Sequence, residues 1–340
     1  MKKLTTLSVA LLFSAGTAFA QSNDATATQE VNNSEITIDQ AGSSNSADAL
    51  QTLGNGNMLI DIDQQGSGNV ADVTQQYGQW HDAQIEQAGS DNDVSLIQDN
   101  TSTLANVSQD GTGNSADIYQ RNYRFAFGTY SSRVDVSQIG DNNEALVSSD
   151  GFGNNVSIVQ GSDTRASDGQ YANVTQNGSD NQATIEQFGR GNADHTQIQN
   201  GDNNEAIADN AWGSNDGFQE QIGSENYSLI RQNGSHSAAV SQDGVNNYSW
   251  LRQSAFSSDA TFTQTGDDNQ INADQRGEGS VMTITQTGSG NTAGTPGFSN
   301  RGIFQIGDYN TITLTQSGNG NAALIDQRGN NNSASISQSE

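Results

Sequence analysis

One short pattern, Q-x-G-x-x-N, recurs along most of this chain. It occurs fifteen times without error, the first copy beginning at Gln40 and the last at Gln327. Degenerate copies fill most of the gaps, so the commonest step between copies is 11 residues and two steps give 22. A fixed period of this length indicates a repeat protein, in which each unit buries its apolar face only against its neighbours.

Apolar and polar residues alternate on both sides of each copy. Ile312 and Leu314 precede Gln316, and Ala323 and Ile325 precede Gln327, with mostly polar or small residues between them. This period of two is typical of a strand with one buried face. The glycine of the motif can adopt the positive φ that a tight turn requires, so the four residues between Gln and Asn are predicted to form a turn.

A strand, a turn, a second strand and a second turn make one rung of 22 residues. The sequence therefore predicts an all-β fold, a β-solenoid of about 13 stacked strand-turn-strand-turn rungs that is amyloid-like in its pairing. Only 31% of the residues are apolar and the mean hydropathy is -0.69, which would otherwise favour a disordered chain. Fifteen exact motifs with alternating apolar positions argue against disorder.

Stacking in register places each inward amide side chain above an identical one. Such a column, here called an amide ladder, satisfies its own donors and acceptors along the stack. The predicted ladder residues are Gln40, Asn45, Gln51, Gln64, Asn69, Gln87, Asn92, Gln109, Asn114, Gln138, Asn143, Gln176, Asn181, Gln187, Gln264, Asn269, Gln275, Gln286, Asn291, Gln305, Asn310, Gln316, Asn321, Gln327, Asn332 and Gln338. The predicted turn glycines are Gly42, Gly66, Gly89, Gly111, Gly140, Gly178, Gly266, Gly288, Gly307, Gly318 and Gly329.

The first twenty residues have the pattern of a secretory signal peptide. Lys2 and Lys3 precede an apolar run, and Ala18-Phe19-Ala20 fits a cleavage site. We therefore expect three segments: a leader at 1–20, an N-terminal segment at 21–33 and the solenoid at 34–340. No later stretch is long and apolar enough for a membrane helix, so membrane insertion is not expected.

Charge limits the partners of the secreted chain. Both lysines lie in the predicted leader, which leaves ten arginines against 39 Asp and Glu. A chain this acidic is not expected to bind nucleic acid or an anionic membrane. Cysteine is absent, which excludes disulfides and thiolate metal sites. The expected partners are cationic, neutral or further copies of the chain.

The repeat resembles that of the curlin family, S-x5-Q-x-G-x2-N-x-A-x3-Q. The segment from Ser34 to Gln51 matches every fixed position, and later copies, such as Gln109 to Gln120, match all but the leading serine. The resemblance implies a functional amyloid of Gram-negative bacteria, exported through an outer-membrane channel, assembled with a nucleator into extracellular fibres, and active in biofilm and adhesion. By position, residues 21–33 would address the chain to that channel, although no motif marks them.

Three insertions depart from the repeat. They lie at Arg121 to Ser132, which contains Tyr123, Phe125, Phe127 and Tyr130, at Gly161 to Gln170, and at Gly294 to Asn300. The last contains Pro296, which cannot donate to a strand ladder. We expect all three to bulge from rung corners.

Sites for chemistry are not evident. His81, His195 and His236 lie far apart without ligand spacing and are predicted to be exposed turn or strand residues. Threonines around Thr283 and Thr313 resemble the outward rows of ice-binding solenoids, but the rows are not expected to continue through consecutive rungs, and β-propensity explains them. No enzymatic activity and no cofactor are predicted.

The favoured function is a structural subunit that assembles end to end. The last residues, Ser335 to Gln338, form a repeat strand without a polar cap, so the final rung is expected to template the first rung of another copy. Outward Asp61, Asp63, Asp135 and Asp326 are interpreted either as gatekeepers against premature assembly or as simple surface solvation. The alternative function is a non-polymerising surface β-solenoid adhesin or a fibre nucleator.

Overall fold

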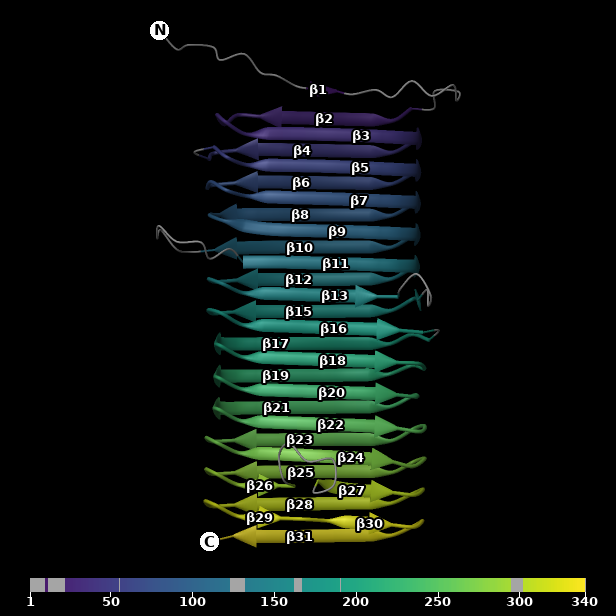
Figure 1. Ribbon diagram of the computed structural model, residues 1–340, viewed down its shortest axis with the longest axis vertical. Helices are drawn as coiled ribbons and strands as arrows, with labels where there is room; N and C mark the ends of the chain where they lie inside the picture. The colour runs from purple at the N-terminus through teal and green to yellow at the C-terminus, as the bar shows by residue number, and fades with distance from the viewer. Residues whose placement is uncertain are drawn as a thin grey trace. The chain divides into compact units, whose positions relative to one another are not determined.

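The computed structural model describes residues 10–11, 22–54, 56–122, 132–161, 167–189, 191–294 and 302–339. Every regular element among these residues is a β-strand, and the strands stack into β-solenoid rungs, about 13 in all, with a spacing of about 22 residues (Figure 1). The predicted fold class is therefore confirmed. The chain forms two compact units, residues 1–156 and 157–340.

The first unit contains two parallel sheets. One sheet has β3 (Glu35–Ser43), β5 (Leu59–Ser67), β7 (Asp82–Ser90), β9 (Thr103–Thr112) and β11 (Ser132–Asp141), with β1 (Ala10–Leu11) beside β3. The other has β2 (Asp24–Gln29), β4 (Ser46–Thr52), β6 (Val70–Gln76), β8 (Asp93–Asn100), β10 (Ser115–Asn122) and β12 (Glu144–Asp150). β13 (Asn155–Gln160) follows at the boundary of the units.

The second unit repeats this arrangement. One sheet has β14 (Ser167–Asp168), β16 (Gln182–Phe188), β18 (Glu205–Ala211), β20 (Tyr227–Asn233), β22 (Tyr248–Ser254), β24 (Gln270–Arg276), β26 (Thr292–Ala293), β27 (Ile303–Ile306), β29 (Ala322–Ala323) and β30 (Asp326–Arg328). The other has β15 (Tyr171–Asn177), β17 (Asp194–Asp202), β19 (Asp216–Ser224), β21 (Ser237–Val245), β23 (Asp259–Thr265), β25 (Val281–Thr287), β28 (Thr311–Ser317) and β31 (Ser333–Ser339).

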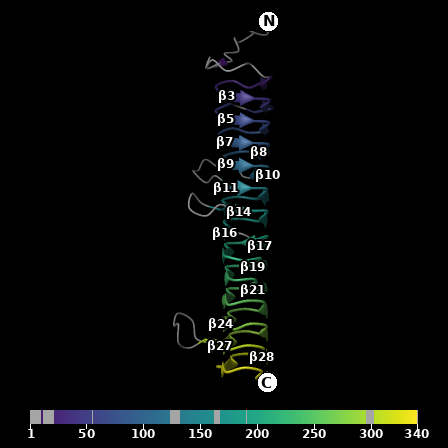
Figure 2. The ribbon, with the colours of Figure 1, turned by 90° about the vertical axis from the view of Figure 1, so that its right-hand side faces the viewer.

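Neighbouring strands of each sheet run parallel and in register. Gln40 lies beside Gln64, and Gln64 beside Gln87, in consecutive rungs of the first unit. The chain crosses from one sheet to the other within each rung, as the side view in Figure 2 shows for both units. Residues at the same position of successive repeats therefore meet.

The core of each unit is the thin layer between its two sheets. Inward Ile60, Ile62, Val73 and Leu96 of the first unit are completely buried, as are Ile230 and Leu251 of the second. Because a strand presents alternate residues to opposite faces, the outward neighbours remain at least partly exposed on most strands. Few apolar residues per rung are needed for a core this thin.

The ladders continue in register past the insertions. β11 pairs with β9 over ten positions, with Gln138 beside Gln109, although 29 residues separate the two glutamines. β27 likewise pairs with β24, with Gln305 beside Gln275. Most of each predicted insertion, at 123–131, 162–166 and 295–301 with the four aromatic residues and Pro296, lies outside the described residues. The described parts belong to strands at three places: Arg121 and Asn122 end β10, Ser132 begins β11, and Ser167 and Asp168 form β14.

The predicted N-terminal segment contains a strand of the fold. β2 lies within residues 21–33 and pairs in register with β4, with Gln29 beside Gln51. The predicted leader contributes β1, whose two residues pair with Thr37 and Ile38 of β3. The rest of the leader lies outside the described residues.

The motif glycines allow adjacent turns to approach each other closely. All eleven predicted turn glycines have φ between +95° and +135°. A Cβ added to Gly66 would lie 1.9 Å from the carbonyl oxygen of Gly89 in the next rung. Both the backbone conformation and the close approach therefore require glycine at this position.

We expect Gly266→Ala to lower the free energy of unfolding more than Gly290→Ala does. Gly266 has φ +104° and its added Cβ would lie 2.2 Å from the oxygen of Gly288, whereas Gly290 has φ +67° with nothing within 4 Å. Gly290→Ala should cost only the left-handed conformation, about 1–2 kcal/mol. Urea unfolding measures both variants, and equal losses would show that the turns are not in close contact.

Candidate functional site: the amide ladders

Two glutamine ladders run through the first unit. In one, the side-chain Nε2 of Gln40, Gln64, Gln87 and Gln109 donates to Oε1 of the glutamine one rung further, at 2.7, 2.8, 2.9 and 2.8 Å, ending at Gln138. In the other, Gln29, Gln51, Gln75, Gln98 and Gln120 are linked in the same way. Except for the first member of each, these side chains are completely or almost completely buried.

An asparagine ladder lies at the turn between the two sheets of this unit. It comprises Asn45, Asn69, Asn92, Asn114 and Asn143, and the Oδ1 of each member but the last accepts both the backbone N–H and the Nδ2 of the next. The Nδ2 groups also donate to turn carbonyls, such as that of Gly111 from Asn92. The ladder thus joins the side chains to the backbone of the glycine turns.

The second unit has ladders of the same kind. Gln176, Gln199, Gln221, Gln242, Gln264, Gln286, Gln316 and Gln338 form the longest one. Gln232, Gln253, Gln275, Gln305 and Gln327 form another. Asn181, Asn204, Asn226, Asn247, Asn269, Asn291 and Asn321 form the asparagine ladder. Asn310 and Asn332 are joined at the opposite turn, where the N–H of Asn332 donates to Oδ1 of Asn310.

The ladders have a direction along the stack. Glutamine side chains donate toward the C-terminal rung, whereas asparagine side chains donate toward the N-terminal rung. Most of the glutamine Nε2 groups also have a second acceptor, a backbone carbonyl such as that of Ser46 for Gln64. The two ends of a ladder therefore expose different groups, which the residue types alone do not reveal.

Aspartate and asparagine residues also clamp the exposed side of the turns. The residue after the turn glycine donates its backbone N–H to a carboxylate or amide oxygen of the next rung, as Thr112 does to Asp141 at 3.1 Å and Ser179 to Asp202 at 2.8 Å. The same contact recurs from Val245 to Asp267. Sequence reasoning missed these residues, although Asp or Asn directly after the motif glycine was a usable signal.

The chain also matches a known model of a sequence family. The model of the curlin associated repeat matches residues 32–60, 59–89, 131–161, 170–193, 281–317 and 307–339, about half of the chain. The chain belongs to the curlin-repeat family. No curated protein matches it.

One glutamine ladder of the second unit is interrupted. Asn210 occupies a glutamine position on β18, and its shorter side chain leaves both its own Oδ1 and the Oε1 of Gln232 buried without a partner. A second exception follows Gln187, where the motif asparagine, Asn192, is exposed and Ala193 takes the buried position. Gln187 itself accepts from Gln160 at 3.0 Å.

The prediction that the three histidines are exposed is wrong. His81, His195 and His236 are 1%, 0% and 4% exposed, because each occupies an inward position of its rung. Nδ1 of His81 contacts the hydroxyl of Thr103 at 2.7 Å, and Nε2 of His236 contacts the carbonyl of Asn233. Burial lowers the pKa of His81 and of His195 to about 4, and it also lowers that of His236.

His195 is held as a neutral imidazole. Its Nε2 lies 3.0 Å from Oε1 of Gln219, an acceptor, so this nitrogen carries the proton. Its Nδ1 lies 3.3 Å from Nδ2 of Asn210 and accepts. The ring fits because the next rung has Gly217, whose added Cβ would lie 1.9 Å from Nδ1 of His195. A residue with no side chain therefore compensates for the large one.

The threonine rows continue further than predicted. On the outer face of the second unit, Thr261, Thr283 and Thr313 lie side by side on β23, β25 and β28, and Ser335 follows on β31. The prediction that the rows break off is wrong, because the 30-residue step from β25 to β28 concealed the register. The side chains of this column are uncharged.

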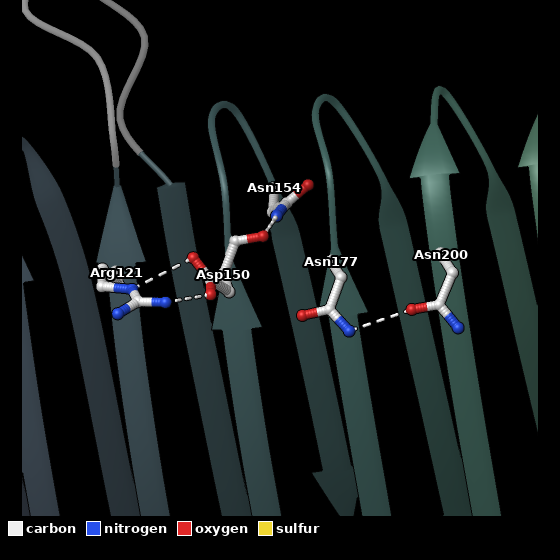
Figure 3. A network of polar contacts seen from close by, with 5 residues as sticks. All are labelled: Arg121, Asp150, Asn154, Asn177 and Asn200. Atoms are coloured by element: carbon white, nitrogen blue, oxygen red, sulfur yellow. Dashed lines mark hydrogen bonds and ion pairs between the residues drawn. The ribbon is translucent and has the colours of Figure 1, made fainter.

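Charged and amide side chains occupy other outer faces. Asp48 and Asp72 lie side by side, and burial together with the charges of Asp48 and Asp93 raises the pKa of Asp72. Arg121 donates from Nε to Asp150 at 3.2 Å (Figure 3). Asn177 donates to Asn200 at 2.9 Å in the same figure. Among the described residues no group of three or more acidic or histidine side chains could hold a metal, and no helix could span a membrane.

We expect Gln87→Leu to destabilise the chain far more than Gln84→Leu. The substitution leaves a buried donor on Gln64 and a buried acceptor on Gln109 without partners, and each such group costs about 1–3 kcal/mol. Gln84 is exposed on the same strand and serves as the control. Urea denaturation compares the two, and equal stabilities would contradict a role for the ladder in folding.

The buried histidines should make the fold sensitive to acid. A base whose pKa is lowered by folding contributes stability above about pH 6.5 that is lost as the pH falls toward 4. We expect the free energy of unfolding to fall, between pH 7 and pH 4, by about 3 kcal/mol more for wild type than for His195→Gln.

The raised pKa of Asp72 acts in the opposite sense, so only the difference between variants isolates the histidine. Unfolding curves of wild type, His195→Gln and the surface control Gln84→Leu at both pH values supply that difference. Parallel pH profiles for wild type and His195→Gln would contradict the conclusion that burial lowers the pKa of His195.

Proposed function

We propose that this curlin-repeat chain is the structural subunit of an extracellular curli-like fibre in which copies stack end to end. The observation that carries the proposal is the outer edge of β31. Thr311 of β28 donates its N–H to the carbonyl of Asn332. The backbone N–H and C=O groups of those β31 residues whose side chains point inward are therefore directed toward β28. By the alternation of a parallel ladder, the backbone groups of Ser333, Ser335 and Ser337 point to the other side, where the described residues provide no strand.

The repeat pattern specifies how a second copy would fit. Placing β30 and β31 of one copy against β3 and β4 of the next brings Gln327 to Gln40 and Gln338 to Gln51. Asn332 then meets Asn45. Because glutamine ladders donate toward the C-terminal rung and asparagine ladders toward the N-terminal rung, each contact joins a donor to an acceptor.

The same alignment buries apolar side chains. Ile325 would contact the position of Ile38, and Ile336 would contact that of Ala49. Ile336 is partly buried and packs against the core of the second unit, so it has apolar surface left for a further rung. Burial of such surface contributes about 25 cal/mol per Å².

Repulsion between carboxylates opposes this end-to-end contact and would limit the rate of assembly. The alignment brings Asp326 near Asp39, and like charges one rung apart repel each other. Arg328 donates from Nε to Asp326 at 2.8 Å and offsets part of that repulsion. Acidic columns such as Asp48 and Asp72 repel in the same way, in support of the gatekeeper interpretation.

We propose the secretion and biological setting of the chain from its family and from the predicted leader. The resemblance supports export through the curli channel, assembly with a nucleator, and a role in biofilm and adhesion at the surface of a Gram-negative bacterium. The activity is self-assembly rather than catalysis. A surface adhesin or nucleator that does not polymerise is the alternative outcome of the experiment below.

We expect Ser337→Pro to abolish fibre growth without unfolding the chain. Proline removes an N–H that points to the free edge of β31, and proline is tolerated where no ladder bond is lost. Ser337→Ala is the matched control and should grow as wild type does. Thioflavin fluorescence and electron microscopy follow growth, and circular dichroism checks the fold.

Growth of Ser337→Pro at the wild-type rate would show that β31 is not the templating edge. A wild-type chain that stays monomeric at every concentration would contradict the fibre itself and favour the adhesin.

A further inference from the structure

We propose that β2 occupies the assembly edge of β4 and is displaced by β31 of a second copy when a fibre forms. The proposal rests on the proposed function and assigns an additional role to residues 21–33. β2 pairs with β4 over six positions, from Asp24 beside Ser46 to Gln29 beside Gln51. It therefore occupies the backbone edge that the end-to-end contact would use.

β2 makes the contacts that β31 would make. Nε2 of Gln29 donates to Oε1 of Gln51 at 2.9 Å, the bond expected from Gln338 of a second copy. Oδ1 of Asn23 accepts the N–H of Asn45 at 3.1 Å, the bond expected from Asn332. The N–H groups of Asp24 and Glu30 donate to the carbonyls of Asn45 and Gln51. The two strands therefore compete for one site.

The sheet beside β2 shows that β2 cannot simply remain in place. Among the described residues, the outer edge of β3 pairs only with Ala10 and Leu11, both in the predicted leader, and no donor reaches Oε1 of Gln40. If β31 stacked on β2 after removal of the predicted leader, and of β1 with it, β30 and β3 would be separated by a missing strand. That separation is about two strand spacings, about 9.6 Å, which no hydrogen bond spans.

Displacement of β2 lets both sheets continue from one copy into the next. β31 then pairs with β4 and β30 pairs with β3, so Gln40 gains a donor while Gln51 and Asn45 exchange one partner for an equivalent one. β31 also has Ile336 where β2 has Ala27, so more apolar surface is buried over Ala49. The incoming strand thus makes the ladder contacts that β2 gives up at Gln51 and Asn45 and adds the contacts of the second sheet.

The consequence is a chain that masks its own growing end. An isolated copy keeps the edge of β4 covered, and only a second copy offering both β30 and β31 replaces β2. The exchange involves backbone and amide groups already present in the fold and breaks no covalent bond.

A reversible cross-link tests the proposal directly. Thr28 and Leu50 lie side by side on the outer face of β2 and β4, and the chain has no cysteine of its own. Thr28→Cys/Leu50→Cys, when oxidised, fixes β2 on β4. The control is Leu50→Cys/Thr74→Cys, which links β4 to β6 in the same column.

With wild-type fibres as seeds, we expect the oxidised Thr28→Cys/Leu50→Cys chain to lose elongation and its reduced form to recover it. The oxidised control should elongate as its reduced form does. Equal elongation of both oxidised chains, with wild type growing normally, would overturn the displacement and leave the proposed function intact. Failure of wild type to grow would overturn both.

Two prolines supply an independent readout. The N–H of Thr28 has the same parity as those of Asp24 and Glu30 and faces β4, whereas that of Ala27 faces away. We expect Thr28→Pro to shorten the lag before growth and Ala27→Pro to leave growth unchanged. Loss of growth in Ala27→Pro would mean that β2 stays in the fibre and receives the next copy itself, which contradicts displacement.

Discussion

In-register stacking of identical backbone and amide groups is the interaction on which the rest of this structure depends. A rung of two short strands buries too little apolar surface to be stable alone, and its inward glutamines and asparagines would be costly without partners. Stacked in register, the same side chains become ladders, as Gln64 and Gln87 do in the first unit. The polar residues that argue against a folded chain by composition are thus what hold it together.

Close stacking constrains the turns as strictly as the strands. Gly66 both adopts a positive φ and allows the next turn to approach closely, and Asp267, directly after the turn glycine Gly266, accepts a turn N–H group. His195 and Gly217 show the same constraint inside the core, where a large side chain is accommodated only because its neighbour has none. Volume and hydrogen bonding are therefore balanced between rungs rather than within one.

The repeat period and the alternation around Gln316 were sufficient to predict the fold class, since both describe contacts that recur in every rung. What differs from rung to rung was not predictable. The inward position of His195 depends on a glycine 22 residues away, and the continuous threonine columns depend on a register that a 30-residue step conceals. The direction of the ladders depends on how each amide is oriented, which residue type does not specify, and the proposed role of β2 depends on its pairing with β4.

In this account, folding and assembly use the same backbone and amide hydrogen-bonding groups. The edge of the last rung exposes the groups that interior rungs use to bind their neighbours. The most direct test of that claim is X-ray diffraction from aligned fibres of the purified chain. Continuous columns from copy to copy predict a meridional reflection near 4.8 Å, the spacing between strands. Ordered fibres without that reflection would contradict the account.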